Sequence, residues 1–236
     1  WRTAHVNRYV KKVTIDEQNE KGLSIRIDWI LNDIQVPYMM EYLICNNGAI
    51  VVTGSIDLTG TKLPELPRFG MRMELHQPYE NLTYYGRGPF ENYIDRYSSS
   101  FIGRYEDKVE NQFYWYTRPQ ETGNKTDVRW LTLLDSGGLG VKITGLQPIS
   151  FSALHFSPED LDPGLTRKLQ HTIDIVPQKN IFLHVDLKQR GLGGDNSWGM
   201  YPHNEYRLLD KKYTYSYMIE LVEKGSDKND YLNSRK

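Results

Sequence analysis

The sequence predicts an all-β protein, a large antiparallel sandwich of two sheets. Apolar and polar residues alternate with period two along most of the chain, and helical periodicity is scarce. Turn-forming sequences separate the alternating segments at short intervals, as in an antiparallel sandwich. No Ser/Gly-rich linker divides the chain, so residues 1–223 are expected to form one domain. The polar residues 224–236 are expected to form a disordered tail.

Half-buried strands are expected wherever the alternation persists over several residues. Turns are expected between them at NNG (46–48), DSGG (135–138) and GLGG (191–194). Residues 58–67 (LTGTKLPELP) are interpreted as a kinked crossing between two strands. The expected strands are, in order, 9–15, 23–29, 48–58, 71–76, 81–85, 130–134, 140–144, 150–156, 181–189 and 213–222.

Only two short segments carry a helical signal. Residues 90–96 have a pattern that fits one or two helical turns. Residues 157–161 begin with a serine suited to capping a turn. Helices are therefore expected to contribute little to the architecture.

Composition excludes several classes of protein. A net charge of −1 gives no electrostatic reason to expect a nucleic acid or a membrane surface as partner. The single cysteine, Cys45, excludes an internal disulfide framework and a multi-thiolate zinc site, and no ligand spacing indicates another metal site. The sequence opens on Trp1 rather than Met, so we expect a piece of a longer polypeptide whose compartment is left open.

The segment YYGRGPFENYIDR (84–96) is too rich in special residues for an ordinary strand connection. Two glycines flank Arg87 and permit backbone angles that other residues resist. The charged groups that follow form either a buried ion-pair network that pins the loop or a surface that faces a polar ligand. The polar residues concerned are Arg87, Glu91, Asn92, Asp95 and Arg96.

The segment GLGGDNSWG (191–199) follows an expected strand and ends in a lone tryptophan among small polar residues. Its glycine spacing is wrong for a dinucleotide fingerprint. The indole of Trp198 can cover the apolar face of a pyranose ring, while Asp195, Asn196 and Ser197 can bind hydroxyl groups. The alternative is that Trp198 caps the end of the sandwich.

Four segments in this order resemble the landmarks of the β-galactosidase small-chain domain, the C-terminal part of large bacterial glycoside hydrolase family 2 enzymes. The resemblance covers nearly all of residues 5–223. The four segments are LPRFGM (66–71), YGRGPFENYIDR (85–96), RPQETGNKTDVRW (118–130) and GGDNSWG (193–199).

The resemblance implies a supersandwich similar to galactose mutarotase, packed beside a separate (β/α)8 barrel that holds both catalytic glutamates. Trp198 matches the aromatic platform of the family, with Asp195, Asn196 and Ser197 in the same loop. This chain would then bind galactoside but contain no catalytic residue and be inactive alone. Magnesium and sodium or potassium are implied for the complete enzyme, with no cofactor in this chain, and complete members are homo-oligomers.

A second group of polar residues lies in the motif segments. We interpret it as locking the loops or meeting the neighbouring barrel, in preference to direct contact with sugar. The residues are Arg87, Glu91, Asn92, Asp95, Arg96, Asn124, Lys125, Asp127 and Arg129.

Two other functions stay open on the sequence alone. A free-standing aldose 1-epimerase would need a general acid and a general base, and His155 and His203 are the histidines with plausible placement. A purely architectural block in an oligomer would need an exposed apolar patch, which a sequence does not reveal.

Overall fold

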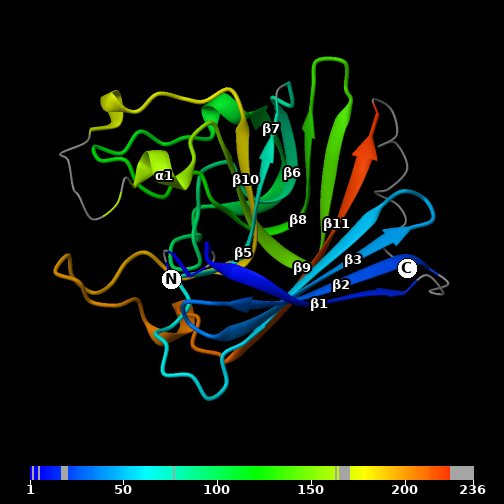
Figure 1. Ribbon diagram of the computed structural model, residues 1–236. Helices are drawn as coiled ribbons and strands as arrows, with labels where there is room; N and C mark the ends of the chain where they lie inside the picture. Colours follow the sequence, from blue (N-terminus) through cyan, green and yellow to red (C-terminus); the bar gives the residue numbers. More distant parts are fainter. Residues whose placement is uncertain are drawn as a thin grey trace.

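The computed structural model describes residues 1, 3–4, 6–16, 21–76, 78–162, 164 and 171–223. Eleven strands dominate these residues, and helix is limited to short turns (Figure 1). The all-β prediction is confirmed. The expected tail 224–236 lies outside the described residues. No helix among the described residues is long and apolar enough to cross a membrane.

All pairs of neighbouring strands are antiparallel. The one α-helical turn among the described residues, α1 (Pro158–Leu161), is capped by Ser157 as the sequence predicts. The strands are β1 (Arg8–Asp16), β2 (Gly22–Leu31), β3 (Val36–Cys45), β4 (Ile50–Asp57), β5 (Arg68–Leu75), β6 (Asn81–Gly88), β7 (Phe101–Lys108), β8 (Lys125–Leu134), β9 (Gly140–Leu154), β10 (Ile181–Gln189) and β11 (Lys212–Val222).

Strand β9 joins the β10–β5 pair to the main path of the sheet. The main path of the sheet runs β1-β2-β3-β4-β11-β9-β8-β6-β7, and β10 joins it through β9 and carries β5 on its other side. The first half of β9 pairs with β11, and the second half, from Ser150 to Leu154, pairs with β10. The sandwich is therefore one continuous hydrogen-bonded network rather than two separate sheets.

The core lies where β5 and β10 face β11. The ring of Phe69 on β5 is 5.5 Å from that of Tyr215 and 5.7 Å from that of Tyr213, both on β11. The buried hydroxyl of Tyr215 donates a hydrogen bond of 2.9 Å to the carbonyl of Val185 on β10. Burial of these aromatic side chains, together with the other buried apolar residues of the core, stabilises the packing between the layers.

Three local expectations were wrong. Strands β3 and β7 were not predicted, and residues 140–144 and 150–156, expected as two strands, belong largely to the single strand β9. Residues 90–96 are not helical: they form a bend closed by an isolated bridge between Tyr93 and Arg96. The side-chain amide of Asn92, within this bend, forms hydrogen bonds with backbone groups, and such bonds compete with helix formation.

Candidate functional site

The four sequence motifs are joined by direct contacts into one cluster. Arg68 of the first motif lies 2.9 Å from Glu121 of the third. Glu91 of the second motif accepts hydrogen bonds from the third motif. Asp95, also in the second, accepts a hydrogen bond of 2.7 Å from the amide of Gly193 in the fourth. Segments far apart in the sequence therefore build one region around the base of the Trp198 loop.

Glu91 is the hub between the second and third motifs. Its carboxylate accepts from the Thr122 hydroxyl at 2.9 Å and from the Gly123 amide at 2.7 Å. Arg96 and the Tyr116 hydroxyl also donate to it. With four donors on a side chain that is only 10% exposed, Glu91 has little capacity left for a ligand. The arrangement favours the loop-locking interpretation for Glu91 and Arg96.

Asn92 fastens the same two motifs at a fully buried position. Its amide nitrogen donates to the carbonyls of Arg87 and Phe90, and its oxygen accepts from the Thr126 amide at 2.9 Å. Asn124 donates in return to the Asn92 carbonyl at 2.7 Å. This reciprocal pairing fixes both loops against the sheet.

Lys125 is a buried cation beneath these loops. Its ammonium group donates to the Gln112 side chain at 3.0 Å and to the Gly123 carbonyl at 3.2 Å. Burial lowers the pKa of Lys125 to about 8, against the opposing effect of Glu91 and Asp107. The side chain is therefore a structural tie rather than a group exposed to a ligand.

Arg87, Asp127 and Arg129 form the outer part of the cluster. Arg87 pairs with Asp127 at 2.5 Å, donates to the Ser100 carbonyl and lies 4.4 Å from the centre of the Tyr97 ring. Asp127 has a positive φ of 52°, a conformation that a non-glycine residue adopts at some cost. The exposed Arg129 donates to the Asp127 carbonyl. These contacts favour the loop-locking interpretation for Arg87, Asp127 and Arg129 as well.

The Trp198 side chain projects from the molecule with 92% of its surface exposed. Three contacts restrain its loop: the amide of Trp198 donates to the Asn196 side chain at 2.9 Å, Asp95 holds Gly193, and Asp195 pairs with His203. Trp198 does not cap the sandwich. Such exposure meets the condition that a stacking role requires, and the role itself stays a prediction, as does the role of the exposed Ser197.

The pair between His203 and Asp195 raises the pKa of His203. The two side chains are 2.8 Å apart, and the hydrogen bond and charge of Asp195, with the charge of Glu205, raise the pKa of His203 above 6.5. A raised folded-state pKa means that the pair contributes fully below the ordinary histidine pKa and is lost as pH rises through the raised value. NMR titration of His203 is expected to give a pKa above 6.5 that falls in Asp195→Asn; an unchanged pKa in that variant would contradict the pairing.

His155 has a structural environment. Its Nδ1 lies 3.1 Å from the Asn180 carbonyl, and its Nε2 lies 3.1 Å from the carboxylate of Glu80. Both ring nitrogens are therefore engaged, which leaves none to serve a sugar hydroxyl as general acid without breaking a contact. His155 and His203 are held by different partners.

Sequence reasoning missed a buried ion pair at the centre of the cluster. Arg68 Nε lies 2.9 Å from Asp186 Oδ2, and Asp186 is 1% exposed on β10. Gly70 makes room for this carboxylate, because a Cβ at that position would lie 1.8 Å from Asp186 Oδ1. The first motif contains Arg68 and Gly70, but nothing in the sequence of β10 marks Asp186 as the partner of Arg68.

Within the described residues, no group of three His, Cys, Asp or Glu side chains is arranged to hold a metal ion. The residues present therefore do not fit a carboxylate or imidazole metal centre.

Comparisons with known proteins identify relatives over the whole domain. The family described as β-galactosidase small chain matches residues 1–219. The chain is 34% identical over 221 residues to a β-galactosidase of Priestia megaterium, and 34% identical over 218 residues to one of Streptococcus thermophilus. These alignments cover 93% and 89% of this chain but 21% and 20% of the relatives. The chain thus spans about a fifth of their length.

One solved structure, an α-galactosidase from Lactobacillus brevis, aligns with 92% of this chain and 26% of its own, with 9% identity and a TM-score of 0.48.

Proposed function

Because this chain belongs to the β-galactosidase small-chain family, we propose that it is the C-terminal carbohydrate-binding domain of a β-galactosidase that cleaves terminal β-D-galactosides with retention. Two catalytic carboxylates would lie in a barrel outside this chain, since retention needs such a pair on either side of the scissile bond. The chain alone would then be inactive.

The observation that carries the proposal is the exposed Trp198 on a restrained loop. An indole stacks on the C–H face of a sugar without changing the charge at the reacting bond. In the assembled enzyme Trp198 would form one wall of the aglycone side, and Asp195, Asn196 and Ser197 would shape the loop. The motif cluster below it would hold the loop in place and face the neighbouring barrel.

The complete enzyme is proposed to use magnesium and sodium or potassium and to assemble as a homo-oligomer. Those ions and partners would act mainly outside this chain. No specific observation favours the epimerase, since both nitrogens of His155 are already engaged. The architectural role is compatible with the first proposal.

The test is steady-state kinetics of Trp198→Ala in the complete β-galactosidase. Stacking contributes about 0.5–1.5 kcal/mol beyond area burial, so KM is expected to rise about two- to tenfold, with a smaller effect on kcat. Trp115→Ala is a matched control, because Trp115 is also exposed, at 61%, but packs on Phe113 and Phe156. A large fall in kcat at unchanged KM in Trp198→Ala would overturn the platform role.

A further inference from the structure

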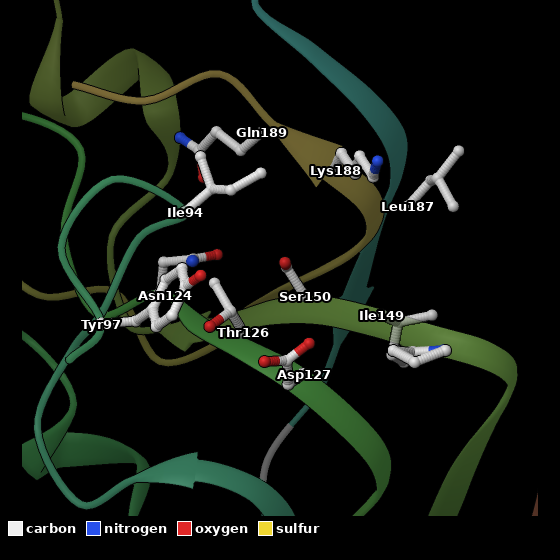
Figure 2. A pocket seen from close by; sticks show the side chains of 11 residues that line it. Ile94, Tyr97, Asn124, Thr126, Asp127, Ile149, Ser150, Leu187, Lys188 and Gln189 are labelled. Atoms are coloured by element: carbon white, nitrogen blue, oxygen red, sulfur yellow. The ribbon is translucent and has the colours of Figure 1, made fainter. Parts of the chain in front are cut away.

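A cavity of about 250 Å³ lies at the base of the Trp198 loop (Figure 2). It is partly open to solvent and is lined by the bend of the second motif, the start of β8 and parts of β9 and β10. Ile94 and Gln189 in its wall are close in sequence to Asp95 and Gly191, the stem of the loop. The cavity is distinct from Trp198, which does not line it.

One buried oxygen of this cavity lacks a partner. The Oδ1 atom of Asn124, a residue 1% exposed, has no hydrogen-bond partner among the described residues, while its amide nitrogen donates to Asn92. Ser150, a residue 6% exposed, adds a hydroxyl group to the lining. Figure 2 shows both side chains facing the same space. A buried polar atom left without a partner costs free energy, which a ligand hydroxyl here would recover.

The rest of the wall combines apolar and charged side chains. Ile94 and Leu187 offer aliphatic surface, and the Tyr97 ring is held by Arg87 at 4.4 Å. Asp127 and Lys188 place one negative and one positive group on the wall. Charges of both signs with apolar surface favour a neutral ligand that has hydroxyl groups and C–H faces.

The volume sets the size of the ligand. The cavity volume equals the volume that about eight water molecules occupy in the liquid. It is smaller than the roughly 300–1,000 Å³ of pockets that bind drug-sized ligands. We propose that this cavity binds a single neutral monosaccharide ring, with hydroxyl groups of the sugar on Ser150 and Asn124, at a site separate from the Trp198 platform. The two sites share no side chain, because Trp198 and its loop neighbours 195–197 do not line the cavity.

The proposal is tested on the whole 236-residue chain by saturation-transfer NMR with D-galactose and D-glucose as probes. Measurements are made in Trp198→Ala, which removes the exposed indole and leaves the cavity. This variant is expected to bind at least one of the two sugars. Adding Ser150→Ala is expected to weaken that binding about three- to tenfold, the effect of losing one hydrogen bond.

Adding Ser150→Phe fills the cavity from β9 and is expected to abolish binding. Thermal unfolding verifies that each variant folds; Ile94→Phe, which fills the cavity from the loop, replaces Ser150→Phe if the latter does not. Failure of Trp198→Ala to bind either sugar would overturn the proposal, and so would binding that survives a folded cavity-filling variant. The Trp198 platform is judged separately by its own kinetics.

Discussion

Replacing Arg68 with methionine is expected to lower the free energy of unfolding by about 3–5 kcal/mol, the usual effect of removing one partner of a buried ion pair. Asp186 would remain buried at 1% exposure without its counter-charge, and neither of its oxygens has a hydrogen-bond partner among the described residues. Glu121 would also lose its contact with the first motif. Urea unfolding followed by circular dichroism measures the change.

Arg72→Met is the matched control on the same strand. Arg72 pairs with Glu159 at 2.7 Å, but the two side chains are 40% and 65% exposed. Exposed pairs of this kind contribute about 0–1 kcal/mol. Equal losses in the two variants would show that burial of Asp186 does not set the effect.

The Arg68→Met defect is expected to depend on pH. Burial raises the pKa of Asp186 to about 7 in the native chain, although Arg68 opposes the shift. A carboxyl whose folded-state pKa is raised contributes stability at low pH and loses it as pH rises from its ordinary value through the raised one. Without Arg68 the pKa of Asp186 rises further, so the defect is expected to grow from acid toward neutral pH.

Asn92→Ala is expected to cost about 2–4 kcal/mol of unfolding free energy, because several buried hydrogen bonds lose one partner at once. The Arg87 and Phe90 carbonyls and the Thr126 amide would lose their contacts with a side chain that is fully buried. Thermal and urea unfolding measure the loss. The same change is expected to loosen the loops around the cavity.

Asn81→Ala provides the comparison for that result. Asn81 also donates its side-chain amide to two carbonyls, those of Leu134 and Asp135, but it is exposed on β6. Water replaces these contacts, so the expected loss is below about 1 kcal/mol. A similar loss in both variants would contradict the role assigned to the buried amide.

The alternation predicted most strands, including β1, which was expected to be half-buried but is exposed along its whole length, and it missed β3 and β7. Strand β4 alternates between buried and half-buried residues, as its sequence indicates. Strand β7 lies at one edge of the sheet with nearly all residues exposed, and β3 is half-buried on both faces. Neither environment requires alternation, so the period-two signal is absent.

The candidate site was predictable in its parts but not in its connections. The motifs identified Glu91, Asn92 and Asp95, whose contacts favour locking. The buried partner Asp186 and the hydroxyl of Tyr116 carry no local pattern, because long-range pairing depends on which strands become neighbours. The spacing of residues along one sequence does not show which strands become neighbours.

The pairing of β4 with β11 has a consequence for how the chain is made. On a ribosome the β1–β4 meander emerges before β11, so the hydrogen-bonding edge of β4 stays open until β11 has left the exit tunnel. An unpaired strand edge is a template for association with other chains. A product of premature termination before β11 would therefore be prone to aggregate, and slow closure of this seam would make nascent chains dependent on chaperones.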